Sequence, residues 1–295
     1  MKKDWVKNKF FNKLNIYQKS AIRGYIFLLP WLIGFVIFTA FPFFYSIYLS
    51  FSKVTITPNG IVTQWIGMSN YLDIFTKDVD FLPALTDSII FVGLSTPLII
   101  VASLLIALML NNKFKGRAIF RAIYFLPVII MSGPVLNELL FNKAINIIQP
   151  SQFALYDFFA TLPFNLGWPI LYLFDRIVLI LWFSGVQILI FLAGIQKIDK
   201  ALYEAAQIDG ASSWVIFWKI ILPEIRPLIL VNAIYTIVDL ATFPSNAINI
   251  QISNKMFQTG MVYSYSSAMS WVYSIIILVI LSIAFLILRE RKDVA

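Results

Sequence analysis

One short polar stretch, Tyr203-Glu204-Ala205-Ala206-Gln207-Ile208-Asp209-Gly210-Ala211, separates two apolar runs of membrane length. Its side chains are mostly small, so the backbone of another protein can approach it closely. Asp209-Gly210 is typical of a helix end, and Ser212 or Ser213 is suited to begin a second short helix. By spacing alone, the stretch is either a docking element or an amphipathic connector between membrane helices.

The same stretch resembles the cytoplasmic EAA loop of binding-protein-dependent ABC importer permeases, in which E-A-A is followed by G and then by I-x-L-P. The matching residues are Glu204, Ala205, Ala206, Gly210, Ile220, Leu222 and Pro223. In that family the loop forms a coupling helix that docks into a cleft of an ATPase subunit. The resemblance implies an ATPase-docking site made of Glu204, Ala205, Ala206, Asp209, Gly210, Ala211, Leu222 and Pro223.

Two of these residues have simpler interpretations. Glu204 is alternatively a solvated charge near the start of a short helix, where a carboxylate is favoured by the helix dipole. Gly210 is expected to be structural, because glycine permits a left-handed backbone or a close approach.

The composition places the chain in a membrane. Of its 295 residues, 60% are hydrophobic and only 13% are charged, which is far from a typical soluble domain. The net charge of +8 lies in patches beside apolar runs, so we expect it to face anionic lipid rather than nucleic acid. Cysteine and histidine are both absent, which excludes disulfides, thiol nucleophiles and histidine bases from this chain.

Six apolar stretches are long enough to cross a hydrocarbon core of ~30 Å. They lie at about 24–49, 85–110, 118–140, 177–195, 225–243 and 270–288. We therefore predict an all-α polytopic membrane protein with six transmembrane helices, and the resemblance implies the type I ABC importer permease fold. Residues 50–84 and 244–268 are expected to be loops.

Three regions follow from these spans. Residues 1–23 form an amphipathic segment on the cytoplasmic side, whose alternative interpretation as a cleaved secretory signal is disfavoured by the length of the next apolar run. Residues 24–288 form the six-helix permease domain, with the EAA loop at about 196–224. Residues 289–295 form a cytoplasmic tail.

The distribution of basic residues orients the chain. Eighteen of the Lys and Arg residues lie on the side of the two termini and the EAA loop, and five lie in the loops on the opposite side. By the positive-inside rule, both termini and the EAA loop are predicted to be cytoplasmic.

A wider resemblance points to the sugar-transporter branch of the same family, that of maltose- and glycerol-phosphate-type permeases. It is carried by 29–35, Tyr45-Ser46, Gly67 with Asn70-Tyr71, Phe120-Arg121 and 192–196. One departure is Thr242-Phe243-Pro244-Ser245-Asn246, where the family often has Thr-x-Gly-Gly-Pro. The resemblance implies a location in a bacterial cytoplasmic membrane.

Polar residues inside the spans are candidates for a substrate pathway, because an ionisable group in hydrocarbon is costly. Asp239, Tyr235 and Asn232 fall on one helical face at i, i+3 and i+7. Gln187 is a fourth candidate, and a hydrogen bond between helices is an equally good interpretation of it. No basic residue lies deep in any span, which favours a neutral carbohydrate over an anion.

We therefore expect a non-catalytic permease subunit of an ATP-driven carbohydrate importer. Its expected partners are a second homologous permease, two ATPase subunits, an extracytoplasmic solute-binding protein and the lipid bilayer. No cofactor is expected in this chain, because it lacks a G-x-x-x-x-G-K-[ST] pattern, so ATP and Mg belong to the ATPase subunits. The alternatives are an importer of another organic solute such as an amine, with Asp239 binding a cation, and an autonomous secondary transporter. A membrane enzyme is a weaker third alternative.

Overall fold

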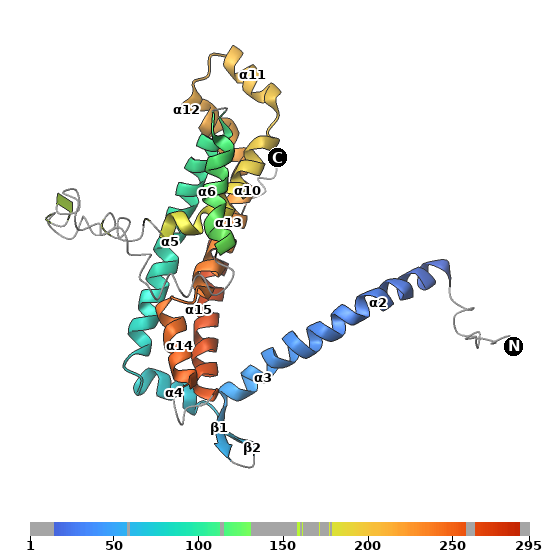
Figure 1. The fold of residues 1–295 in the computed structure, drawn as a ribbon, viewed down its shortest axis with the longest axis vertical. Coiled ribbons are helices and arrows are strands. Elements are labelled where there is room, and N and C mark those ends of the chain that lie inside the picture. The colour runs from blue at the N-terminus through green and yellow to red at the C-terminus, as the bar shows by residue number, and fades with distance from the viewer. Residues whose placement is uncertain are drawn as a thin grey trace. The chain divides into compact units, whose positions relative to one another are not determined.

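The computed structural model describes residues 15–57, 60–112, 115–130, 158–159, 161, 171, 177, 179–257 and 263–289. Three predicted features lie wholly or largely outside these residues: the first fourteen residues of the N-terminal segment, the second half of the span at 118–140, and the tail beyond residue 289. Two compact units make up the chain, one of Met1–Lys77 with Asn254–Trp271, the other of Asp78–Ser253 with Val272–Ala295 (Figure 1).

The first unit begins with a long apolar helix in three parts. These are α2 (Ile16–Phe35), the π turn η1 (Val36–Ala40) and α3 (Phe41–Ser50). Pro42 is the second residue of α3, and its ring lacks an N–H for the carbonyl four residues earlier. In a π turn a carbonyl accepts a hydrogen bond from the N–H of the residue five positions later in the chain, as the Val36 carbonyl does from Phe41. This changed pattern lets the helix continue through the proline without the missing N–H.

A β-hairpin follows, where the sequence analysis expected only a loop. Strand β1 (Ser52–Thr57) pairs antiparallel with β2 (Gly60–Trp65), and Val54 lies opposite Thr63. The strands are rich in β-branched residues, which favour an extended backbone. Two strands of six residues are too short to resemble a membrane span, so the expectation of an all-α chain holds apart from this hairpin.

The hairpin is joined to the end of α3 by a buried amide. Asn70, in α4 (Ser69–Thr76), donates through Nδ2 to the carbonyl oxygens of Ser50 at 2.8 Å and Ser52 at 3.0 Å. The Tyr71 hydroxyl donates to Ser50 Oγ at 2.8 Å. Gly67 has a φ of 62°, which a side chain would strain. These contacts explain why Gly67, Asn70 and Tyr71 form a recognisable sequence pattern.

The second unit is a helical bundle. Its helices are α5 (Phe81–Asn111), α6 (Arg117–Ile130), α10 (Gly185–Lys197), α11 (Lys200–Ile208), α12 (Ser213–Ile216), η5 (Phe217–Ile221) and α13 (Leu222–Thr242). Parts of α14 (Ala247–Phe257) and α15 (Ser264–Leu288) complete it.

Every predicted span coincides, in whole or in part, with helix. Among the described residues, three helices are long and apolar enough to cross a membrane: Gly24–Ser50, Phe81–Asn111 and Ser264–Leu288. The second and third begin four and six residues earlier than predicted. The region expected to be a loop at 244–268 contains α14.

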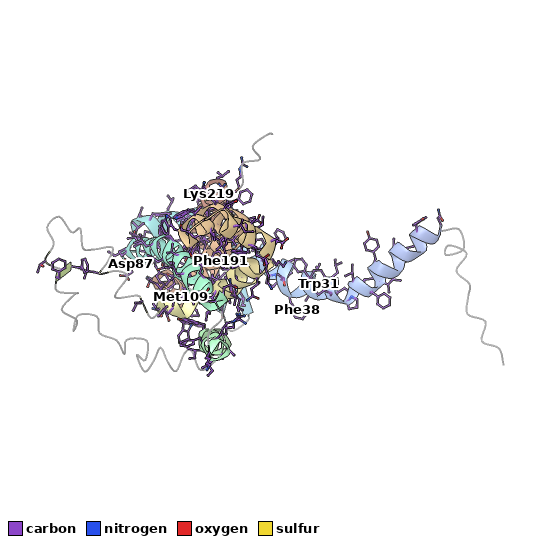
Figure 2. The ribbon with its side chains drawn as sticks, turned by 90° about the horizontal axis from the view of Figure 1, so that it is seen from above. Trp31, Phe38, Asp87, Met109, Phe191 and Lys219 are labelled. Atoms are coloured by element: carbon purple, nitrogen blue, oxygen red, sulfur yellow. The ribbon has the colours of Figure 1, made fainter. Side chains whose placement is uncertain are left out.

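The core of the bundle lies where α5, α10 and α13 pack against one another. Phe191 of α10 and Ile225 of α13 are fully buried there with Ala107 of α5. Figure 2 shows Phe191 inside the bundle, whereas Met109, which is exposed, lies at its edge.

A buried polar network holds the end of α13 that lies farthest from α12. The Asn246 Nδ2 donates to the Leu240 carbonyl and the Tyr273 hydroxyl, both at 3.2 Å, and the Tyr273 hydroxyl donates to the Ala241 carbonyl. Ser88 of α5 donates to Asn246 Oδ1 and accepts from the Ile248 N–H at 3.0 Å. Asn246, within the stretch that departs from the family pattern, therefore joins α5, α13 and α15.

Gly194 of α10 lies directly against the Leu228 side chain of α13. A Cβ at this position would lie 2.1 Å from Leu228 Cδ1. We predict that Gly194→Ala destabilises the bundle by about 1–3 kcal/mol, because Leu228 must leave its rotamer. Thermal unfolding of the purified chain in detergent measures the change.

Gly93→Ala in α5 is the matched control, since nothing lies within 4 Å of a Cβ there. It should be neutral or slightly stabilising, because alanine is the better helix former. Adding Leu228→Ala to Gly194→Ala should recover part of the loss. Equal unfolding temperatures for Gly194→Ala and Gly93→Ala would contradict the close-packing argument.

Candidate functional site

The candidate docking stretch is a pair of short helices joined by a tight turn. Helix α11 starts at Asp199, whose side chain accepts a hydrogen bond from the Ala201 N–H at 3.0 Å. It ends where the Ala211 N–H donates to the Ala206 carbonyl at 2.9 Å and the Gly210 N–H donates to the Gln207 carbonyl at 3.1 Å. This pair of bonds is a Schellman motif, which needs a left-handed residue. Gly210 supplies it with a φ of 74°.

The second helix of the loop runs without a break into the next span. Ser212 caps α12 by accepting from the Val215 N–H at 3.4 Å. The π turn η5 follows, and the Leu222 N–H donates to the Phe217 carbonyl. Pro223 is the second residue of α13, so it stands just after a π turn, as Pro42 does. Helical backbone is therefore continuous from Ser213 to Thr242.

The inner face of the loop packs on the bundle core. Ile216 and Ile221 are buried in the same apolar cluster as Phe191, Ile195 and Leu110. The partly buried residues packed on that cluster include Tyr203, Ala206, Ala211, Phe217 and Ile220. Burial raises the pKa of Tyr203, whose hydroxyl has no hydrogen-bond partner in the described part of the chain. Ala206 and Ala211 are thus the predicted docking residues that face inward.

The outer face of the loop is exposed and mixed in character. Glu204, Ala205, Asp209 and Gly210 are all exposed. Large apolar side chains of the same loop are also exposed, namely Leu202, Ile208, Trp214 and Trp218, with Ile208 86% and Trp214 70% exposed. An exposed apolar patch rimmed by carboxylates is typical of a surface that binds another protein.

Ile208 is a residue that the sequence analysis missed. Its signal was an isoleucine beside Asp209 in an otherwise small and polar stretch. The predicted residues Leu222 and Pro223 lie elsewhere, at the start of α13, where both line a groove against α15.

The four predicted pathway residues fall into two pairs. Gln187 and Asn232 are fully buried between α10 and α13. The Gln187 Nε2 donates to Thr236 Oγ1 at 2.8 Å, and Thr236 Oγ1 donates to the Asn232 carbonyl at 2.7 Å. Gln187 therefore makes the bond between helices that was one of its two interpretations. Thr236, which the sequence analysis did not name, completes this group.

Several atoms of this buried group lack partners. Within the described residues, Gln187 Oε1 and both amide atoms of Asn232 have no hydrogen bond. A buried polar atom left unpaired costs about 1–3 kcal/mol. Gln187 and Asn232 are therefore buried polar residues that keep unused hydrogen-bonding capacity.

Tyr235 and Asp239 make up the second pair. Tyr235 is exposed and Asp239 is half-buried. They share a face of α13 that is distinct from its buried face of Ala233, Ile237 and Leu240. No group of three His, Cys, Asp or Glu side chains among the described residues could hold a metal ion.

Comparison with known proteins gives consistent matches. Residues 78–290 match the family described as "Binding-protein-dependent transport system inner membrane component". The chain is 33% identical over 286 residues to the "Probable ABC transporter permease protein YesP" of Bacillus subtilis (strain 168), covering 91% of each. It is 29% identical over 299 residues to the lactose transport system permease protein LacF of Rhizobium radiobacter, covering 92% of this chain and 95% of LacF.

Solved structures share the fold. A chain from a bacterial ABC transporter involved in the import of the acidic polysaccharide alginate aligns with a TM-score of 0.63 and 24% identity, covering 93% of this chain and 98% of that chain. A chain from the bacterial alginate transporter in complex with an alginate pentasaccharide-bound periplasmic protein aligns with a TM-score of 0.61 at the same identity, covering 92% and 95%.

The turn at Gly210 generates a prediction about the loop alone. Gly210→Ala forces a Cβ into the left-handed region and should cost about 1–2 kcal/mol. The amide of Ala211 should then exchange its hydrogen roughly 5- to 30-fold faster, because the Schellman bond opens more often. Hydrogen exchange of the full chain in detergent measures this.

Gly210→Asn is the informative comparison, since asparagine tolerates the left-handed conformation better than alanine. It should lie between the wild type and Gly210→Ala. Unchanged exchange in both variants would mean that the positive φ does not maintain the turn.

Proposed function

The chain belongs to the family of binding-protein-dependent transport system inner membrane components, and on that premise we propose that it is the permease subunit of an ATP-driven carbohydrate importer. The observation that carries the proposal is the two-faced loop of α11 and α12. One face is packed into the bundle, and the other presents Ile208 and Trp214 beside Glu204 and Asp209. Such a loop is built to receive another subunit and pass its movement to α13.

The ATPase subunits supply the energy, and this chain catalyses no covalent reaction. One ATPase subunit binds the outer face of this loop, and a second binds the corresponding loop of a second permease. Nucleotide and magnesium are bound by those subunits. The exposed apolar side chains gain favourable free energy when a partner removes them from water, and Glu204 and Asp209 add charge-assisted hydrogen bonds.

A second permease chain and an external binding protein complete the importer. The helix Gly24–Ser50 is long and apolar enough to cross a membrane, and we assign its side chains to contacts with lipid and with the second permease. The alginate transporter, which shares this fold, has been solved with a sugar-bound periplasmic protein. We assign the equivalent role here to an extracytoplasmic protein that delivers the sugar.

The orientation follows from charge. Both termini and the loop of α11 and α12 lie in the cytoplasm, because most basic residues are on that side. Residues 1–23 lie on the membrane surface, 24–288 form the permease domain and 289–295 form a tail.

A carbohydrate is the substrate class that the relatives and the side chains favour together. LacF is a lactose permease protein, and a second relative, MalF of Thermococcus litoralis, is a trehalose/maltose permease protein 31% identical over 238 residues, covering 79% of this chain and 77% of MalF. Tyr235 and Asp239 offer a ring and a carboxylate, which suit the C–H faces and hydroxyls of a sugar. Gln187 and Asn232 lie on the buried side of α13, where they help to position it against α10.

The docking role predicts a loss of ATPase binding. Ile208→Glu places a charge in the apolar contact and should reduce both ATPase recovery and sugar uptake roughly tenfold or more. Glu204→Lys should act in the same direction by reversing a charge. Recovery of the ATPase subunits with tagged permease, and uptake in vesicles, measure the two effects.

Ile61→Glu is the matched control, since Ile61 is an exposed isoleucine in strand β2 rather than in the loop. It should leave ATPase recovery unchanged. Full recovery of the ATPase subunits and full sugar uptake in the Ile208 and Glu204 variants would mean that the loop only connects two helices and does not bind the ATPase.

The pathway role predicts an effect of Asp239 that depends on the sugar. Asp239→Asn keeps the shape and part of the hydrogen bonding, whereas Asp239→Leu removes both. Uptake should fall more for leucine than for asparagine, and by different factors for two related sugars. Basal ATPase activity of the reconstituted complex should stay near that of the wild type.

Packing of Asp239 against a partner helix would give the opposite pattern. Leucine would then lower the yield of the complex, and uptake of every sugar would fall equally. Stronger uptake of an organic amine than of any sugar would instead favour the amine importer.

A further inference from the structure

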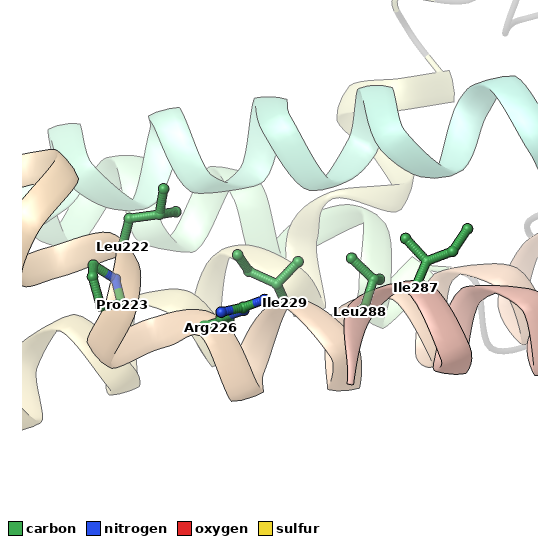
Figure 3. Close-up of a pocket in the computed structure, with 6 residues that line it drawn as sticks. All are labelled: Leu222, Pro223, Arg226, Ile229, Ile287 and Leu288. Atoms are coloured by element: carbon green, nitrogen blue, oxygen red, sulfur yellow. The ribbon is translucent and has the colours of Figure 1, made fainter. Parts of the chain in front are cut away.

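A groove lies between the start of α13 and the end of α15. It has a volume of about 300 Å³ and is lined by Leu222, Pro223, Arg226, Ile229, Ile287 and Leu288. Figure 3 shows Arg226 lying between the side chains of Pro223 and Ile229, with Ile287 and Leu288 projecting from α15. The groove is therefore apolar except for a single guanidinium.

The charge of Arg226 is not neutralised by any acidic side chain in the described part of the chain. Its side chain is exposed, and among the described residues it makes no ion pair. Arg289, also exposed, directly follows the groove residue Leu288. Arg226 is the one charged side chain among the residues that line the groove, so an anionic ligand is the complementary one.

The position of the groove along the helices sets its depth in the membrane. Helix α15 has 25 residues and is about 37 Å long, which exceeds the ~30 Å of a hydrocarbon core. Its last residues therefore reach the level where acyl chains meet headgroups. At that level an arginine commonly extends its charge to the headgroups and lays its methylenes along apolar surface.

We propose that this groove binds one anionic phospholipid from the leaflet on the side of the α11–α12 loop. The headgroup phosphate accepts hydrogen bonds from Arg226, and part of an acyl chain lies among Leu222, Ile229, Ile287 and Leu288. A polypeptide helix with side chains is about 10 Å wide and would not fit a groove of this volume. Water is disfavoured because five of the six lining residues are apolar.

The site has a consequence for the importer. Leu222 and Pro223 belong both to the groove and to the segment that joins the docking loop to α13. A bound lipid therefore contacts the moving part of the permease and stabilises one position of α13 against α15. The binding itself needs neither a sugar nor an ATPase, so its test is independent of the proposed function.

Lipid titration of the full chain in detergent tests the site. Phosphatidylglycerol and phosphatidylcholine with the same acyl chains are added, and bound lipid is counted by native mass spectrometry. We expect phosphatidylglycerol to bind roughly fivefold more tightly, the value of about one charge pair at a membrane surface. Arg226→Gln should abolish this preference.

Two further variants separate the site from general effects. Lys219→Gln removes one exposed positive charge from the same end of the bundle without touching the groove, and it should keep the preference. Ile287→Trp fills the groove while leaving Arg226 in place, and it should weaken binding of both lipids. Thermal unfolding of each variant without lipid verifies that the chain remains folded.

Four outcomes would overturn the proposal. In the first, the wild type binds the two lipids equally; in the second, the Arg226 and Lys219 variants lose the preference equally. In the third, free glycerol phosphate binds as tightly as the lipid. In the fourth, Ile287→Trp leaves lipid binding unchanged. The third would assign the groove to a free anion. Transport that is normal in a variant unable to bind lipid would leave the importer function intact.

Discussion

The close contact between α10 and α13 is the constraint on which the larger unit depends. Gly194 leaves no room for a Cβ beside the Leu228 side chain, so α13 packs its side chains directly against α10 just before α10 leads into the loop. Helix α5 packs against both, and the three helices form one apolar surface. Because the inner face of α11 and α12 packs on that surface, the loop has a fixed position instead of being a solvated connector.

Different interactions position helix α13 at its two ends and in its middle. Apolar side chains pack around Ile225 at the loop end, and the satisfied network of Asn246 and Tyr273 holds the opposite end. Between them, the buried Gln187 is joined to Asn232 through Thr236. Tyr235 lies near that level on the other face, and Asp239 lies one turn farther toward the Asn246 network.

The sequence predicted the apolar helices and the helix stop at Gly210, because length, hydrophobicity and glycine chemistry are local properties. It did not predict the hairpin at Ser52–Trp65, whose six-residue strands carry little periodic signal. Nor did it separate Asn232 from Tyr235 and Asp239, since helical spacing gives a shared face but not the direction of a neighbouring helix. Asn246 was recognised only as a departure from a family pattern; its role depends on Ser88 and Tyr273, which are distant in sequence.

The helical backbone is unbroken from Ser213 to Thr242, so the end of the α11–α12 loop and the face of Tyr235 and Asp239 belong to one rod. Ile225, fully buried beside Gly194, lies between them. Trp214 lies eleven residues to one side of Ile225 and Asp239 fourteen to the other, which correspond to roughly 17 Å and 21 Å along the helix. The loop and the carboxylate are therefore connected by a direct helical path that no loop interrupts.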